Sequence, residues 1–200
     1  MVHITADLAV SVDGFAAGPN QRLERPFGDG NVDQLTRWMF ETAEENAAEI
    51  AAITDTDAFI MGRNMFAPGR GDWDLDWKGW WGDNPPYHKP VFVLTHHERD
   101  DLPMEGGTTF IFVTGGVEDA LKRARQASGD GRISVAGGAS TVNQFLAAGL
   151  LDELRLHAAP LTLGVGERVF DGVPPLSLEQ VSARSASLVT HLTYRIARAS

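Results

Sequence analysis

The protein has 200 residues, of which 43% are hydrophobic and 22% are charged, a composition typical of a globular chain long enough to bury a full core. It contains no cysteine, which excludes disulfides, iron–sulfur clusters, thiol nucleophiles and zinc sites built on cysteine. The formal net charge of −10 disfavours nucleic-acid binding, so a phosphate-bearing ligand would need a local cationic or helix-terminal site.

Residues 2–10 predict a β-strand because apolar residues occupy every second position. One face carries Val2, Ile4, Ala6, Leu8 and Val10, and the other carries His3, Thr5, Asp7 and Ala9. The start of the chain lacks the basic and apolar blocks of a signal peptide, and no apolar run approaches the roughly 18 residues of a membrane helix. We therefore expect a cytoplasmic protein.

After a loop rich in glycine and proline that extends to Gly30, residues 31–54 predict one long helix. Asn31 is a suitable N-cap, with Gln34 three residues later as in a capping box. Apolar residues then follow at roughly helical spacing, and four glutamates are expected on the solvated face. These glutamates are Glu41, Glu44, Glu45 and Glu49.

From Asp57 the pattern changes to short, almost wholly apolar strands separated by helices. The strands are predicted at residues 58–61, 91–94, 110–113 and 133–136, with helices around residues 117–124 and 142–150. Continuous apolar runs of this length are typical of parallel strands buried on both faces. The alternation of strands and helices predicts an α/β fold with right-handed crossovers.

The C-terminal part predicts a different arrangement. Residues 154–159 alternate as a strand, and residues 176–185 and 187–197 predict an antiparallel hairpin at the edge of the sheet. No internal repeat or linker divides the sequence, so we expect a single domain over residues 1–200.

Residues 67–89 form an unusual segment that holds four of the five tryptophans, Trp73, Trp77, Trp80 and Trp81, among glycines, prolines and aspartates. We expect a loop insertion there, because the segment is irregular but too aromatic to be disordered. Two interpretations stay open: the loop covers a substrate pocket, with Trp81 stacking on a flat heterocycle, or it is a packed insertion or a subunit interface.

Residues 133–141 are the strongest local signal for a ligand. A buried strand leads into Gly137 and Gly138, and an amphipathic helix follows that begins with Ala139, Ser140 and Thr141. Two glycines allow a ligand to approach the backbone, and the N-terminus of the helix favours an anion such as a diphosphate. A strand-to-helix turn without a ligand is the alternative. The Rossmann and P-loop patterns do not match this turn.

Two further strand ends carry residues suited to phosphate. Arg63 and Asn64 follow the strand at residues 58–61, and an arginine can hold a phosphate with two hydrogen bonds. Thr95, His96 and His97 follow the strand at residues 91–94, at the carboxyl edge where α/β sheets bind ligands. Adjacent histidines point to opposite faces of a strand, so we expect no metal site there.

Taken in chain order, these motifs resemble the dihydrofolate-reductase-like superfamily and, within it, the reductase domain of riboflavin biosynthesis, the RibD C-terminal domain family. The resemblance rests on Ser11–Gly14, Met61–Arg63, Val93–Thr95, Ala136–Thr141, Leu150–Leu154, Ala159–Pro160 and Gly164–Gly166. It implies a three-layer α/β fold with a mostly parallel central sheet and an antiparallel C-terminal hairpin.

The resemblance also implies that NADPH is the cofactor. The diphosphate would lie at Gly137, Gly138, Ala139 and Thr141, and Arg63 and Asn64 would help to hold both the diphosphate and the adenosine phosphate. Thr95 and His96 would line the site of the adenosine 2′-phosphate, and Gly115 would lie close to the cofactor.

Hydride transfer from a nicotinamide requires mainly orientation of the substrate and a nearby acid. Asp13 is our candidate for this acid and for substrate binding, because it follows the first strand; an ordinary role in an Asp-Gly turn is the alternative. Asp33 and Glu41 lie on the predicted helix but do not reproduce the dihydrofolate reductase pattern.

The sequence therefore predicts an NADPH-dependent reductase of a small, pteridine-like or pyrimidine-like substrate, and the resemblance favours a homodimer. The zinc deaminase half of the bifunctional riboflavin enzyme is excluded, because the sequence has no cysteine and therefore no P-C-x-x-C motif to combine with an H-x-E motif. A nucleotide-binding or sensor protein without turnover is the alternative function.

Overall fold

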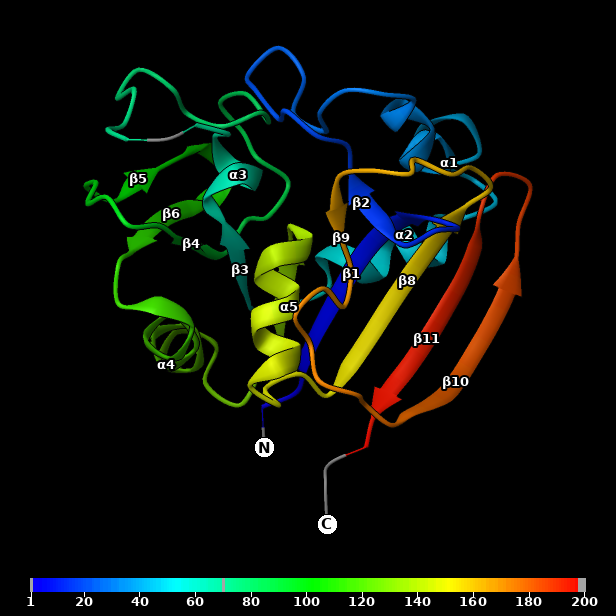
Figure 1. Ribbon diagram of the computed structural model, residues 1–200. Helices are drawn as coiled ribbons and strands as arrows, with labels where there is room; N and C mark the ends of the chain where they lie inside the picture. The colour runs from blue at the N-terminus through cyan, green and yellow to red at the C-terminus, as the bar shows by residue number, and fades with distance from the viewer. Residues whose placement is uncertain (1, 70, 198–200) are drawn as a thin grey trace.

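The computed structural model of the protein describes residues 2–69 and 71–197 (Figure 1). A nine-stranded sheet runs through the molecule in the order β10-β11-β8-β1-β7-β3-β4-β6-β5. The strands of this sheet are β1 (Ile4–Ser11), β3 (Ala58–Gly62), β4 (Pro90–Leu94), β5 (Leu102–Pro103), β6 (Thr109–Val113), β7 (Ile133–Gly137), β8 (Glu153–Ala159), β10 (Leu178–Ser185) and β11 (Thr190–Ile196). Among the described residues, no helix has the length and apolar composition needed to cross a bilayer.

The six central strands, from β8 to β6, run parallel to one another. Strands β3, β4, β6 and β7 are almost wholly apolar because both of their faces are buried, whereas β1 and β8 alternate apolar and polar residues. Helices α4 (Gly116–Ser128) and α5 (Ala139–Ala147) pack on one face, and their buried side chains join those of Ile4, Ala6 and Leu8 in the main core. In Figure 1, α5 lies in front of the sheet and α2 (Ala47–Thr54) lies behind it. The predicted three-layer α/β fold is therefore confirmed.

The C-terminal hairpin is also confirmed. Strand β11 pairs antiparallel with β8 on one side and with β10 on the other, which places β10 at the edge of the sheet. A separate two-stranded sheet pairs β2 (Phe15–Ala17) with β9 (Glu167–Arg168). The sequence did not reveal these short strands, because each lies in a stretch rich in glycine.

The prediction of one helix over residues 31–54 is wrong. The chain forms a 3-10 turn at Val32–Leu35, helix α1 at Arg37–Glu41 and helix α2. The reason is Asn46, whose amide nitrogen donates to the carbonyl oxygens of Trp38 and Thr42. The Asn46 side chain thus occupies carbonyl oxygens that would accept hydrogen bonds from backbone N–H groups in an unbroken helix. Within the described residues, Asn31 makes no side-chain cap hydrogen bond.

The tryptophan-rich segment is irregular, as predicted: its described residues, 67–69 and 71–89, form neither helix nor strand. Trp73, Trp77 and Trp81 pack against a second hydrophobic cluster, which includes Phe66 and Phe110. This segment therefore has an aromatic core of its own, beside β3, β4 and β6.

Candidate functional site

A cavity of about 640 Å³ opens at the carboxyl ends of β3, β4, β6 and β7. Side chains from α1 and from the tryptophan-rich segment line its other side. Parallel sheets bind ligands at this edge, because the strand ends leave loops and helix N-termini free to converge. Eight of the nine predicted cofactor residues lie in its wall: Arg63, Asn64, Thr95, His96, Gly137, Gly138, Ala139 and Thr141.

The turn at Gly137 and Gly138 joins β7 to α5 at the cavity. Gly137 has a φ of 123°, a conformation that favours glycine. A Cβ built on Gly138 would meet no described atom within 4 Å, so the backbone there is open to the cavity. At Gly62 the opposite holds, because a Cβ would overlap the Thr141 hydroxyl of α5. The glycines thus bring the N-terminus of α5 close to the end of β3.

Arg63 begins the short helix α3 (Arg63–Phe66) and lies in the cavity wall. Its guanidinium donates to the carbonyl oxygens of Gly71 and Asp72 and lies 4.0 Å from the centre of the Trp73 ring. Arg63 therefore also fastens the tryptophan-rich segment to the strand edge.

Arg99, which the sequence analysis missed, holds the same segment from the other side. It donates to the carbonyl oxygens of Asp74, Leu75 and Trp77 and packs over the Phe66 and Phe112 rings. Burial lowers the pKa of the Arg99 guanidinium. In contrast to Arg63, Arg99 is not among the residues that line the cavity in the described structure.

The strand end at Thr95 is also part of the cavity wall. The Thr95 hydroxyl is buried and accepts a hydrogen bond from the N–H of His97, whereas His96 is exposed. Gly115 is the predicted cofactor residue that lies outside the wall of the described cavity; its neighbours Thr114 and Gly116 line it instead.

The structure places Asp13 away from the described cavity wall. Its carboxylate accepts hydrogen bonds from the Ser11 hydroxyl and from the N–H groups of Leu163 and Gly164. The Ser11 hydroxyl and, more weakly, the N–H groups of Gly164 and Leu163 lower the pKa of the Asp13 carboxyl. Asp13 thus ties the first strand to the loop after β8, and its predicted catalytic role stays untested.

Trp81 lies in the cavity wall together with Trp80 and Tyr87. Its ring stacks on Phe110, with centroids 5.7 Å apart and an angle of 21° between the planes. The aromatic side chains of the segment therefore pack against the sheet and also form part of the cavity wall, and stacking of Trp81 on a substrate stays a prediction.

Among the lining residues that were not predicted from the sequence, four form a buried polar group. These residues, which we call the polar floor, are Asp7, Trp38, Ser134 and His157. All four are buried, and each has at least one side-chain polar atom without a hydrogen-bond partner among the described residues. Buried polar groups normally find partners, so this cluster favours a polar ligand in the cavity. The one signal in the sequence was the polar face of the first strand, which becomes buried because β1 is a central strand.

Charge is concentrated at the polar floor. The Arg155 guanidinium lies 2.9 Å from Asp7 Oδ2, and His157 Nε2 lies 3.4 Å from Asp7 Oδ1. Behind His157, the Nδ1 atoms of His157 and His191 are 2.7 Å apart. Burial, followed by the nearby His157, lowers the pKa of His191 to about 4, so this imidazole is neutral near neutral pH.

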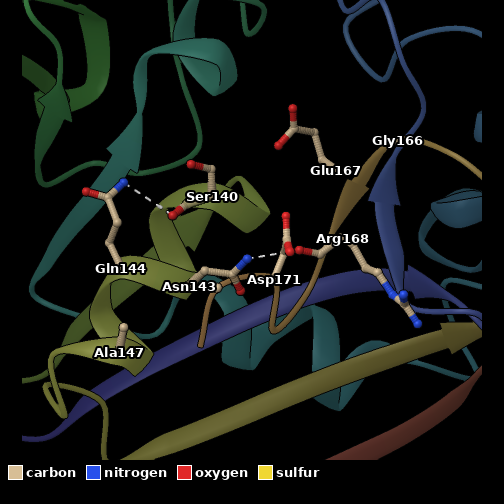
Figure 2. A pocket seen from close by; sticks show the side chains of 9 residues that line it. Ser140, Asn143, Gln144, Ala147, Gly166, Glu167, Arg168 and Asp171 are labelled. Carbon is tan, nitrogen blue, oxygen red and sulfur yellow. Dashed lines mark hydrogen bonds between the residues drawn. The ribbon is translucent and has the colours of Figure 1, made fainter. Parts of the chain in front are cut away.

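A smaller cavity of about 360 Å³ lies between α5 and β9 (Figure 2). Asn143 donates to the carbonyl oxygen of Arg168 there, so its amide fastens β9 to α5. Ser140, Gln144 and Glu167 line both cavities. The smaller cavity therefore lies next to the larger one.

The model of the RibD C-terminal domain family matches residues 2–192. The chain belongs to the RibD C-terminal domain family. A RibD C-terminal domain thus accounts for nearly the whole sequence, and the resemblance drawn from the motifs is confirmed.

Several relatives of this RibD C-terminal domain are similar over most of the chain. YyaP, an uncharacterized protein of Bacillus subtilis (strain 168), is 28% identical over 192 residues, which cover 92% of this chain and 89% of YyaP. The crystal structure of a putative riboflavin biosynthesis protein from Shewanella sp. PV-4 has a TM-score of 0.63 and 23% identity, and the match covers 98% of this chain and 100% of that one.

Two structures of named reductases share the fold. A Thermotoga maritima chain, a diaminohydroxyphosphoribosylaminopyrimidine deaminase/5-amino-6-(5-phosphoribosylamino)uracil reductase, gives a TM-score of 0.62 at 16% identity over 98% of this chain and 57% of its own. The dihydrofolate reductase of Enterococcus faecalis, solved with NADP(H), gives a TM-score of 0.57 at 15% identity, and the match covers 97% of this chain and 96% of that one. At these identities the two structures support the fold alone.

Proposed function

We propose that the protein is an NADPH-dependent reductase that transfers a hydride to a small pteridine-like or pyrimidine-like substrate. The observation that carries this proposal is the single cavity that unites the Gly137–Gly138 turn, Arg63, Thr95 and the polar floor. Membership of the RibD C-terminal domain family supports it, because the structural neighbours include enzymes named as reductases.

The diphosphate of the cofactor would bind at the start of α5. The first N–H groups of a helix lack partners within the helix, and its dipole favours an anion. Gly138 leaves the space in front of these groups open, and the Thr141 hydroxyl lies in the same wall. The attraction at this local site would outweigh the repulsion between the anionic cofactor and the overall charge of −10.

The 2′-phosphate that distinguishes NADPH from NADH would lie near Arg63, Thr95 and His96. These residues follow the neighbouring parallel strands β3 and β4, which places them at one edge of the sheet. Asn64 would assist at the diphosphate.

The substrate would occupy the part of the cavity between the polar floor and the tryptophan-rich segment. Trp80, Trp81 and Tyr87 offer flat aromatic surfaces there. A small heterocycle suits this region because it can stack on a ring and direct its polar edge to unpartnered buried groups. When bound, the nicotinamide would supply the hydride, and the protein would orient both partners and exclude water.

Calorimetric titration with NADPH and NADH, combined with the nicotinamide absorbance, tests the proposal. We expect NADPH to bind more tightly than NADH, and to be oxidised with dihydrofolate, the riboflavin-pathway pyrimidine or a flavin as acceptor. Tight NADPH binding without turnover on all of these acceptors would favour a non-catalytic nucleotide-binding protein. Absence of NADPH binding would contradict both functions.

The variant Arg63→Ala tests the 2′-phosphate site. We expect this variant to weaken the binding of NADPH by roughly tenfold or more and the binding of NADH much less, because a charged hydrogen-bonded pair is lost only with NADPH. Arg99→Ala is the matched control, since it also releases the tryptophan-rich segment but lies outside the described cavity wall. Equal losses for both cofactors in Arg63→Ala would show that this arginine acts only through the segment.

A further inference from the structure

Trp80 differs from the other tryptophans of the tryptophan-rich segment. Trp73, Trp77 and Trp81 pack against the second hydrophobic cluster, whereas Trp80 belongs to none of the hydrophobic clusters of the described residues and lines the cavity. Its ring contacts one aromatic ring among the described residues, that of Trp77, at a centroid distance of 4.7 Å and an angle of 76°. Only one of two rings at this angle presents its face to the other, so at least one face of the Trp80 ring has no aromatic partner there.

Trp81 also lines the cavity, but its ring is engaged in packing. It stacks on Phe110, and the Tyr87 ring meets it at a centroid distance of 5.1 Å and an angle of 77°. Gly79 lies against the same ring, because a Cβ built on this glycine would lie 3.0 Å from Trp81 Cε3. A ligand that stacks on the segment therefore finds the Trp80 ring more open than the Trp81 ring.

Tyr87 offers the cavity a hydrogen-bonding group. Its ring packs against Phe59, Trp81 and Phe110, and the residue is only 7% exposed. The hydroxyl has no hydrogen-bond partner among the described residues, yet its oxygen is not one of their fully buried unpartnered atoms, so it keeps access to open space. Burial raises the pKa of the Tyr87 hydroxyl, which therefore stays protonated and able to donate.

The strand register brings Tyr87 close to the polar floor. Phe59 on β3 pairs with Ser134 on β7 in the parallel register, so both side chains lie on the same face of the sheet. The Tyr87 ring packs against Phe59 at a centroid distance of 4.8 Å and an angle of 67°. Tyr87, Phe59 and Ser134 all line the cavity. The aromatic side of the cavity and its polar floor therefore meet at Phe59.

We propose that Trp80 and Tyr87 recognise the substrate together. The Trp80 ring stacks on a flat conjugated ring, and the Tyr87 hydroxyl donates a hydrogen bond to a carbonyl oxygen or ring nitrogen on the edge of that ring. We call these two residues the recognition pair. This inference deepens the proposed reductase function and rests on it for treating the ligand as a substrate. It gives Trp80 the stacking role that the sequence analysis expected of Trp81.

A flat ring with an acceptor at its edge fits the recognition pair for two reasons. A conjugated ring can stack on the open face of Trp80, whereas a saturated ring has no π surface to offer. The Tyr87 hydroxyl is an unpaired donor in a mostly buried place, and such groups favour a ligand that supplies the missing acceptor. A planar ring that carries a carbonyl group meets both requirements.

The variant Tyr87→Phe tests the hydroxyl, because it removes one oxygen and keeps the ring that packs on Phe59 and Trp81. The probe is lumazine, a flat pteridine with two ring carbonyl groups, titrated calorimetrically into the full-length protein with and without NADP⁺. We expect Tyr87→Phe to bind lumazine at least roughly fivefold more weakly than the wild type, because a carbonyl oxygen loses its donor in a mostly buried place. Equal lumazine affinities would overturn the role given to the hydroxyl.

The variant Trp80→Leu tests the stacking, because it removes the flat ring and keeps an apolar side chain. We expect roughly tenfold weaker binding of lumazine, together with loss of the quenching of tryptophan fluorescence that lumazine causes in the wild type. Leu75→Ala is the matched control, since Leu75 lies in the same segment, is 72% exposed and does not line the described cavity. This control should bind lumazine within about twofold of the wild type.

Thermal unfolding of each variant separates recognition from folding. If Trp80→Leu unfolds at a lower temperature than the wild type, Trp80→Phe takes its place, and its smaller ring should give an intermediate loss of lumazine affinity. Wild-type affinity and quenching in a stable Trp80 variant would contradict the stacking role.

The same titrations distinguish failure of the recognition pair from failure of the proposed function. No binding of lumazine to the wild type, with or without NADP⁺, would overturn the recognition pair even if NADPH binds. If lumazine binding depends on Trp80 and Tyr87 but NADPH does not bind, the recognition pair is supported as a ligand site and the proposed reductase function fails.

Discussion

At the scale of single residues, Gly62 and Gly138, which lie near the β7–α5 turn, contribute differently to stability and to the proposed binding of NADPH. Gly62→Ala should lower the free energy of unfolding by about 1–3 kcal/mol, because its methyl group overlaps the Thr141 hydroxyl and pushes α5 from β3. Chemical denaturation measures this loss. A Gly62→Ala protein as stable as the wild type would mean that α5 can move without cost.

Gly138→Ala should behave in the opposite way. The methyl group meets no described atom within 4 Å, so we expect a loss of stability below about 1 kcal/mol. The same methyl would stand where the diphosphate is proposed to approach, so NADPH affinity should fall by roughly tenfold in calorimetry. Unchanged NADPH affinity would argue that the diphosphate lies elsewhere.

His191 predicts a dependence of stability on pH. The pKa of an imidazole is about 6.5 in the unfolded chain, and burial lowers that of His191 to about 4. Between these values the unfolded state binds a proton that the folded state does not. The contribution of His191 is therefore complete above pH 6.5 and falls, by at most about 3 kcal/mol, as the pH drops toward 4.

Urea denaturation of the wild type and of His191→Gln across this range provides the measurement. The variant should lose stability less steeply on acidification, because glutamine does not titrate. The exposed His3→Gln variant should retain the wild-type slope. Identical slopes in His191→Gln and the wild type would contradict the assignment.

At the scale of elements, the sequence predicted the parallel strands well because their burial on both faces leaves continuous apolar runs, as at residues 58–61. It failed over residues 31–54, where apolar spacing continued through a break that depends on Asn46. The partners of Asn46 include His191 and Arg184, about 140 residues away along the chain. Periodicity detects a buried face but not a long-range polar contact.

The same inability of local patterns to detect long-range contacts explains which residues of the candidate site could be predicted from the sequence. Glycine turns and arginines at strand ends can be recognised locally, so most of the cavity wall around Gly137, Arg63 and Thr95 was anticipated. Asp7 and His157 could not be recognised, because each is one polar residue in an alternating strand. Their significance arises only from the pairing of β1 with β8.

The Asn46 network makes a prediction at this scale. Asn46→Ala should lower the free energy of unfolding by about 2–4 kcal/mol, because it leaves His191 Nε2 and the Arg184 guanidinium without their buried acceptor. Asn31→Ala is the control, since within the described residues Asn31 forms no side-chain cap, and it should cost less than about 0.5 kcal/mol. Denaturation curves of both variants measure the difference; similar losses would contradict the role given to Asn46.

At the scale of the whole molecule, the proposed NADPH site joins four strands and two helices, so binding should stabilise the entire fold. At a concentration one hundred times its Kd, NADPH should add about 2.7 kcal/mol and raise the Tm by roughly 5–10 °C. Calorimetric scans measure the shift, with NADH at the same concentration as the control. No shift with NADPH would contradict the proposed function.

The hydrogen bonds from Arg63 and Arg99 to the tryptophan-rich segment have a consequence for redesigning this protein. The segment is anchored through its own backbone carbonyl oxygens, which any sequence of the same length and path would present. Side chains that line the cavity but do not belong to the aromatic core, such as Trp80, can therefore vary while the anchoring is kept. Segments transplanted from relatives should be accepted when both arginines and the packed Trp73, Trp77 and Trp81 remain, so that the other positions of residues 67–89 can be exchanged to alter the choice of substrate.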